Sequence, residues 1–122
     1  GSTIDSSNLS INHSNGEKIY QSKENTIYRS QDNKITAENG LNMNMNQNQT
    51  NFLGKVEILQ RTGTKIFTSN LIVDQSDGGE FYKSDYPTKY ISSKSNITAK
   101  KIYYDAILNI IDLQGEVEAV YE

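Results

Sequence analysis

Apolar and polar residues alternate with a period of two along several short stretches of the chain. Leu41, Met43 and Met45 alternate with asparagines, and an extended strand points successive side chains to opposite faces. The apolar residues of this stretch do not recur every three or four positions, as they would on an amphipathic helix. Comparable alternation begins at Phe52, at Phe67 and at Leu113. The pattern therefore predicts half-buried strands and an all-β fold.

Short polar segments separate these stretches and predict tight turns. Several contain glycine, which readily adopts the positive φ that hairpin turns require. Strands of roughly six to eight residues, with turns every 8 to 12 residues or so, are typical of a sandwich, roll or solenoid. We expect a meander of antiparallel hairpins whose first and last strands stay unpaired. The turn segments are Asn15-Gly16, Gln31-Asp32-Asn33, Gln47-Asn48-Gln49, Arg61-Thr62-Gly63-Thr64 and Asp77-Gly78-Gly79.

Three segments echo one another at an interval of about 31 residues, as expected of a repeat architecture. They are Ile35-Thr36-Ala37, Phe67-Thr68-Ser69 and Ile97-Thr98-Ala99, with threonines 32 and 30 residues apart. The first and third lead into similar phrases that contain glycine, Phe52–Ile58 and Asp112–Ala119. Such a period indicates that one supersecondary unit is stacked several times, so that each unit covers the apolar face of its neighbour.

Length and composition predict one domain with a thin core. The chain has 122 residues, of which 34% are hydrophobic, a low fraction for a soluble domain. Gly1-Ser2 is typical of the remnant of a cleaved expression tag, so we assign the domain to residues 3–122. No apolar stretch has the 18 or so residues of a membrane-spanning helix.

Charge and residue types exclude several classes of function. The net charge of −3 provides no basic surface for nucleic acid. Cysteine is absent and His13 is the one histidine, which leaves no ordinary zinc site. Asp74, Asp77 and Glu80 flank a Gly-Gly turn and could in principle bind calcium, but aspartate beside glycine is ordinary turn chemistry. We expect no catalytic residue, no cofactor and no metal.

The repeated phrases resemble the periplasmic lipopolysaccharide-transport family, which has the OstA-like fold. The resemblance covers about Ile19 to Tyr121 and combines the three threonine segments with Leu53–Ile58 and Leu113–Val117. The chain is more similar to LptC than to LptA, because it ends shortly after the phrase from Gly115 to Tyr121. The middle repeat departs from the pattern, since Tyr86–Ile91 stands where a Leu-x-Gly-x-Val phrase is expected.

This resemblance implies an OstA-like β-jelly roll in the periplasm, held to the inner membrane by a helix upstream of the present residues. The implied function is not enzymatic. The roll receives lipopolysaccharide from the inner-membrane ABC transporter and passes it through an apolar groove to the next, LptA-like roll. The implied partners are lipopolysaccharide, the transporter complex and other rolls, with edge-to-edge self-association as a further expectation and no nucleic acid.

On this interpretation, the alternating apolar residues line the lipid groove and the last strand is the edge that binds the next roll. The predicted groove residues are Leu41, Met43, Met45, Phe52, Val56, Ile58, Phe67, Leu71, Val73, Ile91 and Val117. The predicted partner-binding edge comprises Leu113, Gly115, Val117, Ala119 and Tyr121.

Three other interpretations remain open from the sequence. The chain could be an LptA-like soluble bridge protein, or a structural β-solenoid with a dry core. An enzyme such as a polysaccharide hydrolase would need acidic residues clustered in a cleft. The pattern instead places Glu57, Glu116 and Glu118 on outer strand faces.

Overall fold

The structure, a computed structural model, describes residues 2–121. Gly1, half of the predicted tag remnant, and Glu122 lie outside the described residues. This part of the chain forms antiparallel strands and one 3-10 turn, Ser76–Gly78. The strands are β1 (Thr3–Ser6), β2 (Ser10–Ser14), β3 (Glu17–Ser22), β4 (Thr26–Arg29), β5 (Asn33–Ala37), β6 (Leu41–Asn44), β7 (Gln49–Gln60), β8 (Lys65–Asp74), β9 (Phe81–Ser84), β10 (Thr88–Ile91), β11 (Ser95–Ala99), β12 (Lys101–Asp105), β13 (Ile110–Gln114) and β14 (Glu118–Tyr121).

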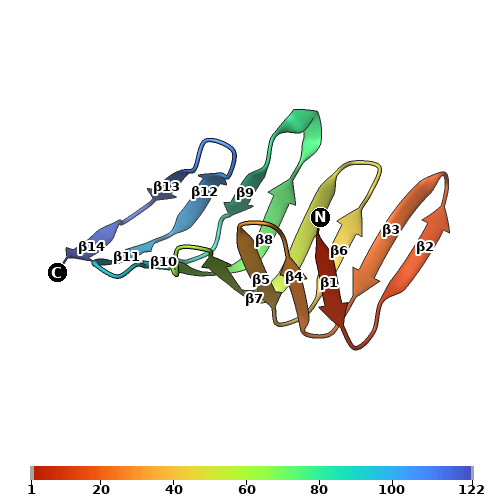
Figure 1. The fold of residues 1–122 in the computed structure, drawn as a ribbon, viewed down its shortest axis with the longest axis horizontal. Helices are drawn as coiled ribbons and strands as arrows, with labels where there is room; N and C mark the ends of the chain where they lie inside the picture. Colours follow the sequence, from red (N-terminus) through yellow and green to blue (C-terminus); the bar gives the residue numbers. More distant parts are fainter. Residues whose placement is uncertain (1, 122) are drawn as a thin grey trace.

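The strands form two facing layers that share β7 and β8 (Figure 1). The first layer has the order β1-β4-β5-β7-β8-β10-β11-β14. The second layer has the order β2-β3-β6-β7-β8-β9-β12-β13, which follows from the pairings outside that path. β7 and β8 belong to both layers because each is long and bends midway, so that one half pairs in each layer. The result is a folded-over sheet, closed along one side by the bends, and the predicted roll of antiparallel hairpins is confirmed.

The bends explain the glycine in the repeated phrases. Gly54 has a φ of 77°, in the left-handed region, and the β7–β8 register shifts between Phe52 and Lys55. A Cβ atom at Gly54 would lie 2.5 Å from the Nδ2 atom of Asn39 in the neighbouring bend. Gly115, in the bend between β13 and β14, also has a positive φ. The phrase therefore marks a corner of the roll, where a side chain has neither room nor a relaxed backbone.

Two triads of hydroxyl side chains connect the layers near the corner. In the first triad the Oγ atoms of Ser6 and Ser22 are 2.8 Å apart, and in the second the Thr68 hydroxyl donates to Ser84 over 2.9 Å. Thr26 completes the first triad by a bond to Ser6 over 3.2 Å. Thr88 completes the second by a bond to Thr68 over 3.0 Å. The triads, Ser6-Ser22-Thr26 and Thr68-Ser84-Thr88, have the same internal spacing and lie 62 positions apart. They are therefore equivalent corners, two repeats apart.

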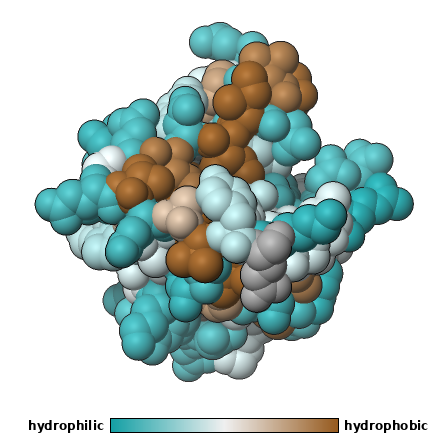
Figure 2. Space-filling model, turned by 90° about the vertical axis from the view of Figure 1, so that its left-hand side faces the viewer, coloured by the Kyte–Doolittle hydropathy of each residue, from teal (hydrophilic) through white to brown (hydrophobic). Residues whose placement is uncertain are grey.

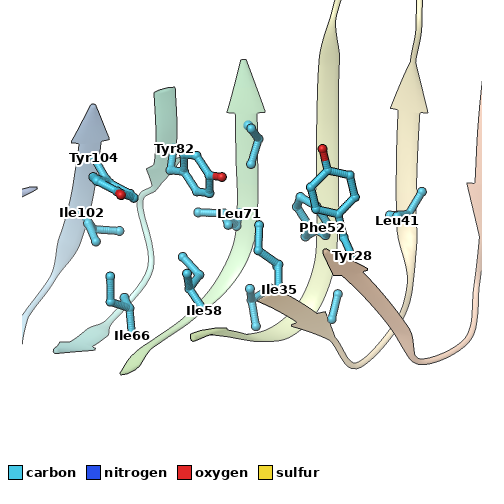
Figure 3. Close-up of a cluster of buried hydrophobic side chains, with 13 residues drawn as sticks. Tyr28, Ile35, Leu41, Phe52, Ile58, Ile66, Leu71, Tyr82, Ile102 and Tyr104 are labelled. Carbon is cyan, nitrogen blue, oxygen red and sulfur yellow. The ribbon is translucent and has the colours of Figure 1, made fainter. Parts of the chain in front are cut away.

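The hydrophobic core runs lengthwise between the inner faces of the two layers (Figure 3). Tyr28 and Phe52 pack edge to face with ring centroids 5.6 Å apart, and Tyr82 and Tyr104 pack with centroids 5.1 Å apart. Aliphatic side chains fill the space between these aromatic pairs. The core residues are Tyr28, Ile35, Ala37, Leu41, Phe52, Val56, Ile58, Ile66, Leu71, Val73, Tyr82, Ile102 and Tyr104.

Both ends of the roll expose unpaired strand edges. Within residues 2–121, β1 and β2 each pair with one neighbour at one end, and so do β13 and β14 at the other. The open edge strands predicted from the sequence are thus confirmed. The continuous last strand predicted from Leu113 onward is wrong, because the bend after Gln114 sends β13 and β14 into different layers.

Candidate functional site

The space between the two layers is the candidate site, and it is filled in the middle of the roll. Ile35, Leu41 and Ile58 are fully buried there. Free volume lies instead beside this packed centre, in one cavity towards β1 and β3 and in another between the β4–β5 and β7–β8 turns and the β12–β13 hairpin. The interior therefore consists of a packed centre between two cavities, which differ in size and in polarity.

The smaller cavity lies near the N-terminal end and has a volume of about 290 Å³. Ile4 contributes to it from the first layer, and Tyr20 and Met43 contribute from the second. Met43 and Ile4 are partly buried and pack against the core. A flexible, polarisable methionine beside an aromatic ring suits an apolar ligand of variable shape. This cavity is the more apolar candidate for holding an alkyl chain.

The larger cavity, of about 800 Å³, lies between the turns of the first layer and the end of the β12–β13 hairpin. Its size falls in the range typical of small-molecule sites. Tyr90 and Ile111 form apolar walls and pack against the core. Asn33, Gln60 and Tyr104 bring polar atoms to the same cavity. It can therefore contact both parts of an amphiphilic molecule.

A hydrogen bond joins the two layers at the inner end of this cavity. The Nδ2 atom of Asn33, on β5, donates to the Tyr82 hydroxyl, on β9, over 3.2 Å. Burial raises the pKa of Tyr82 above its ordinary value, the charge of Glu80 adds to the rise, and the bond from Asn33 opposes it. Burial also raises the pKa of Tyr104, against hydrogen bonds from Asn33 and Gln60. The fold therefore favours the neutral phenols.

These shifts predict that the protein loses stability in alkali. A raised pKa in the folded state leaves stability unaffected below the ordinary tyrosine pKa of about 10, and stability falls as the pH rises above it. Thermal unfolding followed by circular dichroism from pH 8 to 11.5 should show a falling melting temperature above about pH 10. The Tyr82→Phe variant should show a smaller fall. An equal fall in both proteins would contradict a contribution from Tyr82.

Most of the predicted groove residues lie on the inner faces, but they occupy different parts of the interior. Met43 is half-buried and faces the smaller cavity. The others are buried and fill the packed core: Leu41, Phe52, Val56, Ile58, Leu71 and Val73. Their contact with lipid is untested and stays a prediction.

Four of the predicted groove residues do not lie on an inner face. Phe67 is 36% exposed between the buried Ile66 and Thr68, so its predicted inward orientation is wrong. The cause is Asn70, whose φ of 49° marks the bend of β8 and shifts the alternation there. Ile91 follows the inward Tyr90 and points outward by alternation. Met45 lies exposed in the β6–β7 turn but lines the rim of the smaller cavity, and Val117 lies exposed in the bend before β14.

The predicted partner-binding residues all lie at the open C-terminal end. Leu113, on β13, is partly buried and packs against the core. Ala119 and Tyr121, on β14, pair with Ile97 and Ser95 of β11 and are exposed. Gly115 and Val117 occupy the bend. Figure 2 shows this end of the molecule, where hydrophobic side chains gather in the middle and extend upward. Exposed apolar residues of this region are Ile107, Leu108, Ile110, Val117, Val120 and Tyr121.

The residues of the larger cavity are not among those predicted from the sequence. Tyr104 and Ile111 lie directly opposite each other on β12 and β13, but each adjoins another apolar residue, Tyr103 or Ile110, which weakens the alternation there. The sequence pattern assigns Asn33 to a turn. Its bond to Tyr82 joins residues 49 positions apart, and such a contact cannot be predicted from the local sequence.

Asp74, one of the three carboxylates considered for calcium, bonds to Ser76 within its own turn. The Oδ1 atom of Asp74 accepts a bond from the Ser76 backbone amide over 2.9 Å, and this bond together with one from the Ser76 hydroxyl lowers the pKa of Asp74. Across residues 2–121, no three acidic, histidine or cysteine side chains are grouped so that they could hold a metal ion. The same residues include no helix with the length and apolarity needed to cross a membrane.

Comparisons with known proteins place this geometry in context. The family described as lipopolysaccharide-assembly, LptC-related, matches residues 16–122. Among solved structures, the chain is similar to LptH from Pseudomonas aeruginosa, described as the LptA-homologous periplasmic component of the conserved lipopolysaccharide transport device. That match has a TM-score of 0.74 at 12% identity and covers 100% of this chain and 95% of the other. A search of curated proteins found no match.

Proposed function

The chain belongs to the LptC-related lipopolysaccharide-assembly family, and from this premise we propose that it is a non-enzymatic component of the lipopolysaccharide export bridge. In this proposal its interior holds the acyl chains of lipopolysaccharide during their passage between the membranes. The energy for transport comes from the ABC transporter, because the roll itself only binds and orients the lipid.

The observation that carries this proposal is the apolar interior with a cavity on either side of its packed centre. Partly buried apolar side chains extend the core into each opening: Ile4 and Met43 at one, Tyr90 and Ile111 at the other. Burial of alkyl chains against such surfaces is favourable by about 25 cal/mol per Å². The packed centre must then separate locally, or the lipid must pass along the side where the layers are open.

We further propose an LptC-like position in the bridge, directly after the transporter. An upstream membrane helix would hold the roll, and β13 and β14 would add to the first strands of an LptA-like roll. The support is that both strands have one free edge within the described residues, which allows pairing by β-augmentation. Likeness to an LptA-homologous structure favours a second candidate, a soluble LptA-like bridge protein with the same groove.

Photo-crosslinking tests whether lipid enters the interior. Benzoyl-phenylalanine at position 43 should form adducts with purified lipopolysaccharide after irradiation, because Met43 faces the smaller cavity. The matched control is position 72, since Ile72 lies on the outer face of β8 and is 37% exposed. We expect at least about tenfold more adduct at position 43, consistent with one to two kcal/mol of preferential burial. Equal labelling at both positions, or none at position 43, would refute the groove.

The same crosslinker tests the proposed edge. Val120 lies on β14 and is 64% exposed. Benzoyl-phenylalanine at position 120 should crosslink an LptA-like partner roll, whereas position 72 should not. Adducts between two copies of this chain would instead indicate edge-to-edge self-association, and the absence of any protein adduct would count against this edge.

A further inference from the structure

One buried polar atom in the larger cavity has no hydrogen-bond partner. Asn33 is only 5% exposed. Its Nδ2 atom donates to Tyr82, but within residues 2–121 no donor reaches its Oδ1 atom. Leaving a buried acceptor unpaired costs about 1–3 kcal/mol. The Oδ1 atom therefore calls for a donor from a molecule that enters the cavity.

The surroundings of Asn33 indicate what kind of molecule this is. Tyr90 and Ile111 give the cavity apolar walls continuous with the core. Gln60 lies directly opposite Asn33 on the neighbouring strand β7 and lines the same cavity. Asp32 and Arg61 are exposed at the outer side and face each other at 4.0 Å. The lining of the cavity is thus polar on the solvent side and apolar on the core side. Asn33 lies where the polar and apolar parts of the lining meet.

We propose that this cavity is a polar subsite for an amphiphile with a hydroxyl or amide N–H where its polar head joins its alkyl chain. The donor bonds to the Oδ1 atom of Asn33, the alkyl chain lies against Tyr90 and Ile111, and the head group faces the rim. The inference rests on the proposed lipid groove and adds to it a fixed point at which the polar part of the lipid is held. Plain alkyl chains fit the smaller cavity better.

Two probes isolate the hydrogen bond. 1-Monodecanoylglycerol and methyl decanoate have the same ten-carbon acyl ester and no charge, but only the first has hydroxyl donors. Affinities below the micellar concentration, measured by titration in ¹H–¹⁵N spectra of the full chain, give a preference ratio. Asn33→Leu should lower this ratio by about 5- to 150-fold, the factor that corresponds to one unpaired buried acceptor. Asn96→Leu, the same change at an exposed position of β11 outside the cavity, is the matched control and should keep the wild-type ratio.

The spectra also provide a test that needs no variant, in case Asn33→Leu fails to fold. The side-chain amide resonances of Asn33 should shift on addition of 1-monodecanoylglycerol and not on addition of methyl decanoate. If both probes bind without any shift at Asn33, or with an unchanged ratio in Asn33→Leu, the subsite is refuted and the groove stands. If neither probe binds, the subsite is also refuted. Crosslinking at position 43 then decides separately on the groove.

Discussion

Replacing Gly40 by alanine is expected to abolish folding of the roll. Gly40 lies buried in the bend between β5 and β6, with a φ of 93°. A Cβ atom there would lie 2.1 Å from the carbonyl oxygen of Ser22, a backbone atom that cannot move without separating β3 from β6. Such a clash adds to the backbone strain, and we expect a loss of more than about 4 kcal/mol. That is a large part of the stability of an ordinary domain.

Gly63 is the matched control for this prediction, because its φ is also 93° but a Cβ atom added to it would have no neighbour within 4 Å. Gly63→Ala should cost only the backbone strain, about 1–2 kcal/mol. Urea unfolding followed by circular dichroism measures both variants. If Gly40→Ala lost no more stability than Gly63→Ala, the close packing of this corner would be wrong.

Truncating Phe52 is expected to have the second largest effect. Its side chain is 1% exposed and packs edge to face against Tyr28 in the centre of the core. Phe52→Ala removes this contact and leaves a cavity, at a cost of about 3–5 kcal/mol. Phe67→Ala deletes the same atoms from the outer face of β8 and should cost less than about 1.5 kcal/mol, because Phe67 is partly exposed. Urea midpoints at constant slope give both values.

The comparison of these two phenylalanines tests the structure where it departs from simple alternation. An inward Phe67 would make both truncations similarly costly. A large cost for Phe52 and a small one for Phe67 would establish that the inner face of β8 changes phase at the bend. The measurement thus tests whether Phe67 points outward, away from the candidate groove.

The sequence predicted the fold class because strand alternation is local. Leu41, Met43, Phe52, Val56 and Ile58 were assigned to one face correctly, since side-chain direction follows the backbone residue by residue. The stacked organisation was also predictable, because the threonine segments recur at a regular interval and the first and third lead into similar glycine-containing phrases.

The rest depended on bends and on long-range contacts. A left-handed residue such as Asn70 shifts the alternation by one position, and asparagine adopts this conformation in few of its occurrences. The division of Leu113–Tyr121 between two layers has the same origin at Gly115 and Glu116. At the larger cavity, the fold places Asn33 beside Tyr82 and Tyr104. These residues are far apart in the sequence, so no local pattern predicts the contact.

The hydroxyl triads have a consequence for how such a chain can change in length. The first triad begins at Ser6 and the second at Thr68, so an equivalent corner returns after 62 residues. An inserted residue within a strand would turn every later side chain to the wrong face, whereas whole units restore the pattern. Each unit of about 31 residues adds two strands to each layer, or roughly 10 Å at the usual strand spacing. Lengthening this roll without disturbing its inner and outer faces therefore requires steps of about that size.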